Sequence, residues 1–252
     1  MNENKVKEGT GIHTERAPWS ASAAYLYLLK LDNVSLAWEY LRRNQAYQAN
    51  WRDAALRSDS CVAARWGLRH LEDPCRDARA AEPLWCPTPA LSLRLVKHFD
   101  EATAAKFQFW CIPGHKSLVH DGFGMLLTAR HPPSVRRAVL DLDLATDAPY
   151  GFLIPAGSLT QDGCRAVREF TALYQTRATP NHNDLPERPT RSAVIHMRTL
   201  QAIDGAGSGA SQREIARAIF GSSAVQAQWS PDSELRAQVR YFLRKHSAIP
   251  VC

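Results

Sequence analysis

The C-terminal part of the chain carries two adjoining stripes on one predicted helix, and this pattern constrains the fold more than any other feature of the sequence. Apolar side chains recur at the spacing of one helical face, at Leu235, Val239, Phe242 and Leu243. Arginines recur beside them, at Arg236, Arg240 and Arg244. At about 100° of rotation per residue, each set stays within one stripe. The sequence therefore predicts a helix, beginning near residues 231–233, that packs on one side and presents a row of guanidinium groups.

A shorter helix is expected before this one, because local signals mark both of its ends. Ser211 and Glu214 have the spacing of a capping box, which predicts a helix over residues 212–220. Gly221 suits the left-handed conformation that closes such a helix. The residues expected to be buried along it are Ile215, Ala216 and Ile219.

Two further helical segments complete the predicted C-terminal unit. One begins at Thr190 and ends in the glycine-rich run 205–209, with an apolar stripe formed by Ala193, Met197, Leu200 and Ile203. The other is an extra helical turn within residues 221–232, since Val225 and Trp229 are four positions apart. The usual helix-turn-helix connection is only three or four residues long, so we predict a four-helix variant of that motif.

Positive charge is concentrated in this segment. Residues 188–252 hold eight arginines and one lysine against four acidic residues, which places +5 of the net charge of +6 here. A localised basic excess favours a polyanionic partner, and a guanidinium group can grip a guanine edge or a phosphate through two hydrogen bonds. A charge stripe is often only a solvated face, but the capped helix before it favours double-stranded DNA as the partner. The candidate DNA-contacting residues are Gln212, Arg213, Arg217, Ser233, Arg236, Ala237, Arg240, Tyr241, Arg244 and Lys245.

Position along the last helix predicts the role of its cations. Arg236 and Arg240 lie in the N-terminal half, where a recognition helix usually meets base edges. Arg244 and Lys245 lie farther along and are expected to meet backbone phosphates. Base readout and positioning on the duplex are thus assigned to different residues.

The N-terminal half is predicted to be helical. Two short helices are expected between residues 19 and 43, one with its stripe at Tyr25, Leu28 and Leu29, the other at Leu36, Ala37, Tyr40 and Leu41. Asp32 or Asn33 would cap the second helix, and Asn44 would end it. Tryptophans and prolines follow, with prolines at 74, 83, 87 and 89, and these predict a break in regular structure.

A small antiparallel sheet is expected in the middle of the chain. Strands are predicted from the alternation of Phe107, Phe109 and Cys111 and from apolar segments at residues 118–119, 125–128, 135–142 and 152–154. A helix follows, with Val167, Phe170, Leu173 and Tyr174 on one face. We therefore predict an α+β fold with a disordered tail over 1–18, a helical domain over 19–104, a β region over 105–157 and a helical helix-turn-helix domain over 158–252.

Several short runs in both halves of the chain carry a resemblance to a known family. They are Phe-Leu-Ile-Pro-Ala-Gly at 152–157, Arg-Glu-Ile-Ala at 213–216, Ile-Phe-Gly at 219–221, Trp229, and Leu-Arg-x-x-Val-Arg at 235–240. The chain resembles the proteobacterial regulators of integrative and conjugative elements whose members include the FseA activator and the QseM antiactivator. Residues 25–43, Trp51, 65–68 and 71–74 resemble the partner domain of activator-type members. The resemblance covers most of residues 19–249. It implies a regulator of excision or transfer genes that can bind antiactivators of related fold.

Other chemistries find less support in the sequence. His115 and His120 would need a third ligand to hold a metal, and the carboxylates of Asp141, Asp143 and Asp147 fit the solvent side of a strand better than a magnesium site. His196 lies among apolar residues and is expected to be a satisfied core histidine. The chain has no P-loop, G-x-S-x-G or G-x-G-x-x-G motif, and its six cysteines form no C-x-x-C pair, so we expect no enzyme, catalytic residue, metal or cofactor.

Three hypotheses of function remain, and the first is preferred. The chain is expected to be a sequence-specific transcription activator whose N-terminal half contacts RNA polymerase or a partner subunit. The second hypothesis is a protein-interaction module, similar to an antiactivator, that binds a related regulator without contacting DNA. The third is a metal-dependent nuclease or recombination enzyme. The longest apolar run, residues 23–31, is too short to cross a bilayer, so we expect a cytoplasmic protein without membrane contact.

Overall fold

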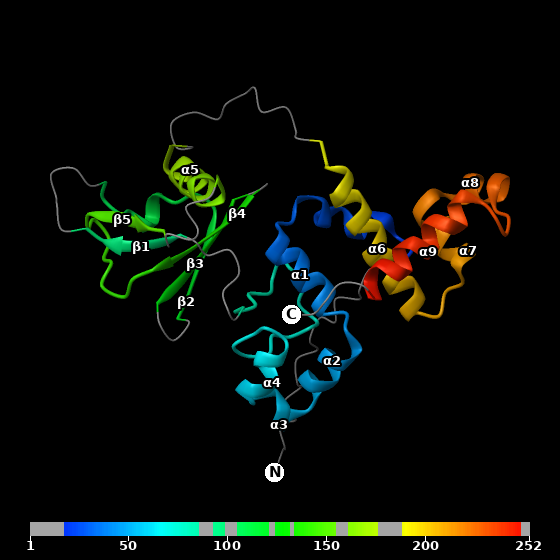
Figure 1. Ribbon diagram of the computed structural model, residues 1–252, viewed down its shortest axis with the longest axis horizontal. Coiled ribbons are helices and arrows are strands. Elements are labelled where there is room, and N and C mark those ends of the chain that lie inside the picture. Colours follow the sequence, from blue (N-terminus) through cyan, green and yellow to red (C-terminus); the bar gives the residue numbers. More distant parts are fainter. Residues whose placement is uncertain are drawn as a thin grey trace, which may run out of the picture.

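The computed structural model describes residues 18–85, 93–98, 105–120, 124–131, 134–154, 161–175 and 188–247. Helices occupy both ends of the described chain and a five-stranded sheet lies between them in the sequence (Figure 1). The predicted α+β class is confirmed. In the described part of the chain, no helix combines the length and the apolar character that a membrane crossing requires.

The N-terminal half contains more helix than the sequence predicts. Its elements are the 3-10 helix η1 (Ser22–Lys30) and the α-helices α1 (Asn33–Leu41), α2 (Gln45–Arg52), α3 (Ala54–Arg57) and α4 (Ser60–Arg65). Asp32 caps α1 as expected, by accepting a hydrogen bond from the Ser35 N–H at 2.9 Å. Asn44 does not end α1 but caps α2, accepting from the N–H groups of Ala46 and Tyr47. The sequence predicted only two helices in this region, and α2 to α4 add to them. Tyr47 of α2 and Val62 and Ala63 of α4 pack with Trp38 of α1 in one buried cluster.

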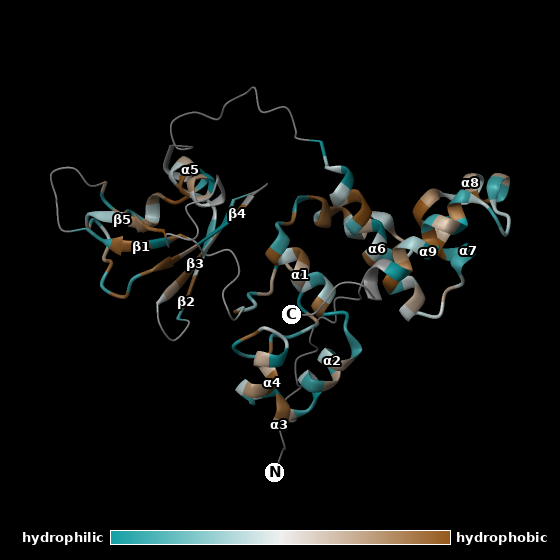
Figure 2. Cartoon of the chain, in the orientation of Figure 1, coloured by the Kyte–Doolittle hydropathy of each residue, from teal (hydrophilic) through white to brown (hydrophobic). Residues whose placement is uncertain are grey.

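The sheet has the order β2-β3-β4-β1-β5. Its strands are β1 (Arg94–Lys97), β2 (His115–His120), β3 (Met125–His131), β4 (Ser134–Leu140) and β5 (Tyr150–Leu153). All neighbouring pairs are antiparallel except β1 and β4, which run parallel. Figure 2 shows hydrophobic colour on β1, whose sequence is Arg-Leu-Val-Lys.

Two predictions about the sheet region were wrong. The alternation at 107–111 does not form a strand: Phe107 is buried, and Phe109–Cys111 is the 3-10 helix η2. The strand β1 lies inside the segment 19–104 that we expected to be helical. The run Arg-Leu-Val-Lys has only two apolar residues and carries no clear periodic signal, and β1 is defined by its pairing with β4 and β5, which follow later in the chain.

The two faces of the sheet are covered differently. On one face, helix α5 (Gln161–Gln175) places the buried Phe170 in a core with Leu95, Leu127 and Leu140. On the other face, strand residues contact the N-terminal helical region. Arg130 donates hydrogen bonds of 2.9 Å to the carbonyls of Ala78 and Ala81. Arg137 forms an ion pair with Asp32.

The C-terminal unit has the predicted four helices. They are α6 (Arg191–Gly207), α7 (Gln212–Phe220), α8 (Ser222–Gln228) and α9 (Glu234–Ser247). Both hydrogen bonds of the capping box between Ser211 and Glu214 are present. Gly221 has a positive φ of 90°, but its ψ of 154° lies outside the left-handed helical region. It adopts an extended ψ because it links α7 directly to α8, which begins at the next residue.

The core of this unit confirms the predicted helix phasing. Ile215 and Val239 are 1% and 0% exposed and belong to one cluster, which also holds the fully buried Val225 of α8. Ile219, expected to be buried, lies only partly buried at the edge of that cluster. Figure 2 shows hydrophobic and hydrophilic segments on both α6 and α9, as amphipathic helices require.

Truncating either central side chain is expected to loosen the unit. Ile215→Ala or Val239→Ala should lower the free energy of unfolding by about 1–4 kcal/mol, because each change removes buried methyl groups and leaves a cavity. Chemical denaturation followed by circular dichroism measures the loss. Leu142→Ala is the control, since that side chain is 64% exposed. Equal losses for the buried and exposed positions would contradict this packing.

Candidate nucleic-acid interface

Helix α9 begins at a serine cap, which sets the direction in which its side chains project. The Ser233 hydroxyl donates to the Ser230 carbonyl at 2.9 Å and accepts from the Arg236 N–H at 3.4 Å. Ser233 is therefore half-buried and engaged in holding the first turn. Its predicted role in contacting DNA competes with this local role.

The arginine row lies on the outer side of α9, next to its packed face. Arg240, Arg244 and the intervening Ala237 are exposed, whereas Val239 and Phe242 are buried. Arg236 is half-buried, and its Nη1 approaches the Pro231 carbonyl at 3.5 Å. The side chain of Lys245 lies outside the described residues. The structure thus places a surface of cations at successive turns beside the core of the unit.

Helix α7 adds two more exposed arginines to the unit, Arg213 and Arg217. Among the residues that the structure describes, none makes a hydrogen bond or an ion pair with the side chain of Arg213, Arg217, Arg240 or Arg244. Other arginines of the protein behave differently, because Arg43, Arg94 and Arg137 are all held by carboxylates. The four guanidinium groups of α7 and α9 keep their donors available for a ligand.

Most carboxylates of this unit are engaged in internal hydrogen bonds, and Glu214 also interacts electrostatically with Arg217. Glu214 folds back on the start of α7, where its Oε2 accepts from the Ser211 N–H at 2.7 Å. The hydrogen bond from the Ser211 hydroxyl lowers the pKa of Glu214, so the group is ionised and committed to the cap. Asp204 is bound on α6 by Arg43 and Tyr25. Glu234 accepts from the Gln238 Nε2 atom at 3.0 Å, so three of the four acidic residues in 188–252 are engaged in internal contacts.

Two residues of the predicted set have other surroundings. The Oε1 atom of Gln212 is buried and has no hydrogen-bond partner among the described residues. Tyr241 is 46% exposed but lies on the flank of α9 nearest to α1, about 100° around the helix from Arg240. Burial raises the pKa of Tyr40 on α1 to about 12, and the proximity of Tyr241 adds to that rise. Gln212 and Tyr241 therefore have surroundings that differ from those of the exposed arginines Arg213, Arg217, Arg240 and Arg244.

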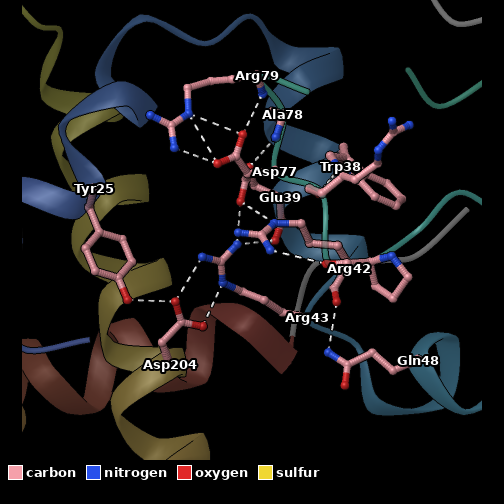
Figure 3. Close-up of polar contacts among 12 residues, drawn as sticks. Tyr25, Trp38, Glu39, Arg42, Arg43, Gln48, Asp77, Ala78, Arg79 and Asp204 are labelled. Atoms are coloured by element: carbon pink, nitrogen blue, oxygen red, sulfur yellow. Dashed lines mark hydrogen bonds and ion pairs between the residues drawn. The ribbon is translucent and has the colours of Figure 1, made fainter. Parts of the chain in front are cut away.

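The largest feature that the sequence did not reveal is a polar network between α1 and α6 (Figure 3). Asp204 accepts hydrogen bonds from the Arg43 Nε and Nη2 atoms at 2.8 and 2.9 Å and from the Tyr25 hydroxyl at 2.7 Å. Arg43 also pairs at 2.5 Å with Glu39, which is 0% exposed and accepts from the Ala78 N–H. This network ties three parts of the chain that are far apart in sequence.

The charges of this network stabilise one another. Burial alone lowers the pKa of Arg43, but the hydrogen bonds and charges of Asp204 and Glu39 outweigh it, and the pKa lies above its ordinary value. Burial and the neighbouring Asp204 both raise the pKa of Tyr25, so its hydroxyl keeps the proton that it donates. Arg42 and Arg43 stand three and four residues after Glu39, and this spacing was the one available hint in the sequence.

Asp141, Asp147 and His196, which were considered as metal ligands from the sequence, form hydrogen bonds with other side chains of the protein. Asp141 accepts a hydrogen bond from Arg94 Nε at 2.5 Å, and Asp147 accepts one from Gln108 at 3.1 Å. Within the described ranges, no three His, Cys, Asp or Glu residues gather into a group that could hold a metal ion. His196 is half-buried and shares a hydrogen bond of 2.9 Å with the Tyr40 hydroxyl, as expected for a satisfied core histidine.

Comparison with protein families gives three matches along the chain. Residues 153–249 match a family described as a T6SS transcription factor, DNA binding domain, which covers α5 to α9. Residues 18–70 match a proteobacterial transcriptional regulator-like domain, and residues 93–136 match a domain of unknown function. No curated protein matches the chain. The chain thus combines a DNA-binding domain with a regulator-like domain, which supports a transcription regulator of the proteobacterial type.

Proposed function

We propose that this regulator is a sequence-specific, DNA-binding transcription activator that controls excision or transfer genes of a mobile genetic element. The single observation that carries the DNA contact is the set of unpaired, exposed arginines on α7 and α9. The resemblance to regulators of integrative and conjugative elements supports the choice of target genes. A cytoplasmic location follows from this role.

The surface suits a duplex with α9 in the major groove. Arg236 and Arg240 would reach base edges, where a guanidinium group can bind guanine O6 and N7 together. Ala237, exposed between them, has no long side chain to hold the helix away from the bases. Arg244 and Lys245, with Arg213 and Arg217 on α7, would meet phosphates.

The N-terminal half would serve a protein partner in this scheme. We propose that the helical region matched by the regulator-like domain contacts RNA polymerase or an antiactivator of related fold. An activator needs such a second contact, because binding to DNA alone does not recruit transcription. A protein that used the arginine surface for a regulator, and never for DNA, would be the antiactivator-like alternative.

Salt dependence tests whether the arginine surface binds phosphate. Upstream regions of neighbouring genes, screened by gel shift, supply the specific site. If about four cations neutralise phosphates, the logarithm of the affinity should fall with the logarithm of the salt concentration at a slope of roughly −4. Fluorescence anisotropy of a labelled duplex measures the slope. An affinity unchanged between low and physiological salt would exclude this surface as the DNA contact.

A matched variant controls for net charge. Arg65→Ala removes an exposed arginine from α4, in the N-terminal half, and should leave the slope unchanged. Arg213→Ala should make the slope shallower by about one unit. Equal changes for the two variants would mean that the slope reports overall charge, and would contradict a localised interface.

A further inference from the structure

The segment before α1 has a repeat of three residues. The residues of this segment that contact the C-terminal unit, or a cluster shared with it, recur at every third position. They are Trp19, Ser22, Tyr25, Leu28 and Leu31. In a 3-10 helix, which has three residues per turn, positions i and i+3 lie directly above one another. Ser22–Lys30 forms such a helix, nine residues long, whereas most 3-10 helices stop after three or four. The sequence pattern predicted an α-helical stripe with Leu29, but the buried stripe follows the period of three.

The first two members of this stripe contact the DNA-binding unit directly. Trp19 packs so closely on α6 that a Cβ atom added to Gly205 would lie 2.9 Å from its ring and 3.0 Å from Ile215 of α7. Gly205 therefore lies within the last turn of α6, where it admits the tryptophan, and α6 ends at Gly207, inside the run 205–209 where the sequence predicted its end. Trp19 belongs to the partly buried rim of the cluster that contains Ile215 and Val239.

Ser22 and the Trp19 carbonyl satisfy polar groups of two helices of the unit. The Ser22 hydroxyl donates to the Ala218 carbonyl of α7 at 2.9 Å, one of the carbonyls that has no partner within its own helix. Gln201 of α6 is 0% exposed, and its Nε2 donates to the Trp19 carbonyl at 3.2 Å and to Ser22 Oγ at 3.1 Å. The segment thus helps to cover the Gln201 amide and pairs its two donors, which would be costly to bury without partners.

The remaining members of the stripe continue along α6. Tyr25 donates to Asp204, and Leu28 shares a buried cluster with Leu200, which is 0% exposed. Leu31 packs at the edge of the same cluster. Figure 1 shows this N-terminal segment, in dark blue, running beside α6. Every member of the stripe thus contacts the C-terminal unit or a cluster shared with it.

We infer that residues 19–31 are an integral fifth helical element of the DNA-binding unit, contributed from the opposite end of the chain. The unit that presents the arginines is therefore discontinuous, since the segment belongs by sequence to the regulator-like match at 18–70 and by packing to α6 and α7. Its role is to position α6, against which α9 packs. The structural part of the inference is independent of DNA binding, and its consequence for DNA reading rests on the proposed function.

Hydrogen exchange in the full-length chain tests the inference. Trp19→Ala should make the slowly exchanging amides of α6, α7 and α9 exchange at least about tenfold faster, because they lose a shared buried contact. Amides of α2, α4 and β3 should keep their rates, since Trp19 belongs to neither of the clusters that stabilise them. Trp110→Ala is the matched control, because that tryptophan is 76% exposed and lies in η2. It should leave the exchange of α6, α7 and α9 unchanged.

A milder variant covers the case in which Trp19→Ala prevents folding. Ser22→Ala removes only a hydroxyl and should raise exchange near the end of α7 and around Gln201 by a few fold. Unchanged exchange of α6, α7 and α9 in both variants would overturn the inference, as would faster exchange confined to residues 19–31. A DNA titration of the wild type is read separately. If the wild type fails to bind DNA, the proposed function is wrong. The exchange rates still show whether residues 19–31 belong to the C-terminal unit.

Discussion

Replacing Arg240 with Ala is expected to weaken binding to the specific DNA site by about 1–3 kcal/mol and to change binding to a scrambled duplex very little. The physical reason is that Arg240 is exposed on the N-terminal half of α9, where a recognition helix meets base edges, and has no partner within the described protein. Paired titrations of specific and scrambled duplexes at one salt concentration measure the difference.

Two further variants serve as controls for the effect of Arg240→Ala on specific binding. Lys245→Ala removes a cation expected to contact phosphate, so it should weaken both duplexes alike and reduce the salt slope by about one unit. Arg65→Ala, on α4, should affect neither duplex. If Arg240→Ala retained full affinity for the specific site and instead lost binding to a protein partner, the antiactivator-like function would replace the one proposed.

Replacing Arg43 with Met is expected to lower the free energy of unfolding by about 3 kcal/mol, the lower end of the range for breaking a buried ion pair. The change leaves the carboxylates of Glu39 and Asp204 close together without the cation between them. Glu39 keeps its contacts with Arg42 and the Ala78 N–H, which is why we expect the lower figure. Equilibrium denaturation by urea measures the loss.

An exposed ion pair supplies the control for this measurement. Arg165 pairs with Glu169 at 3.9 Å, and the two side chains are 67% and 40% exposed, so Arg165→Met should cost less than about 1 kcal/mol. A double-mutant cycle of Arg43→Met with Asp204→Asn should show a coupling energy well above that of an additive pair. Additive losses would show that the two residues stabilise the protein independently.

The sequence was most informative where the signals were local. The capping box at Ser211, the apolar stripe through Val239 and the extra turn at Val225 were all predicted, because each depends on residues within one or two helical turns. These signals define the four helices of the unit. They also place the exposed Arg240 and Arg244 beside the packed face, as the structure has them.

The failures involve partners that are distant in the sequence. The contact of Arg43 with Asp204 spans 161 positions, and neither residue is unusual by its local pattern. Strand β1 needs β4 and β5 to define it. The sequence predicted an α-helical stripe at Tyr25, Leu28 and Leu29. The buried stripe instead has a period of three, from Trp19 to Leu31, and its partners on α6 and α7 are distant in the sequence.

Helix α1 is held at its two ends by different parts of the molecule, and this limits how those parts can move. At its start, Asp32 forms an ion pair with Arg137 of the sheet. Just past its end, Arg43 forms an ion pair with Asp204 of α6. A helix of nine residues is a stiff rod about 14 Å long, so it cannot absorb a rotation between its ends. Any turning of the sheet relative to α6 must therefore break one of these two ion pairs or drag α1 along with it.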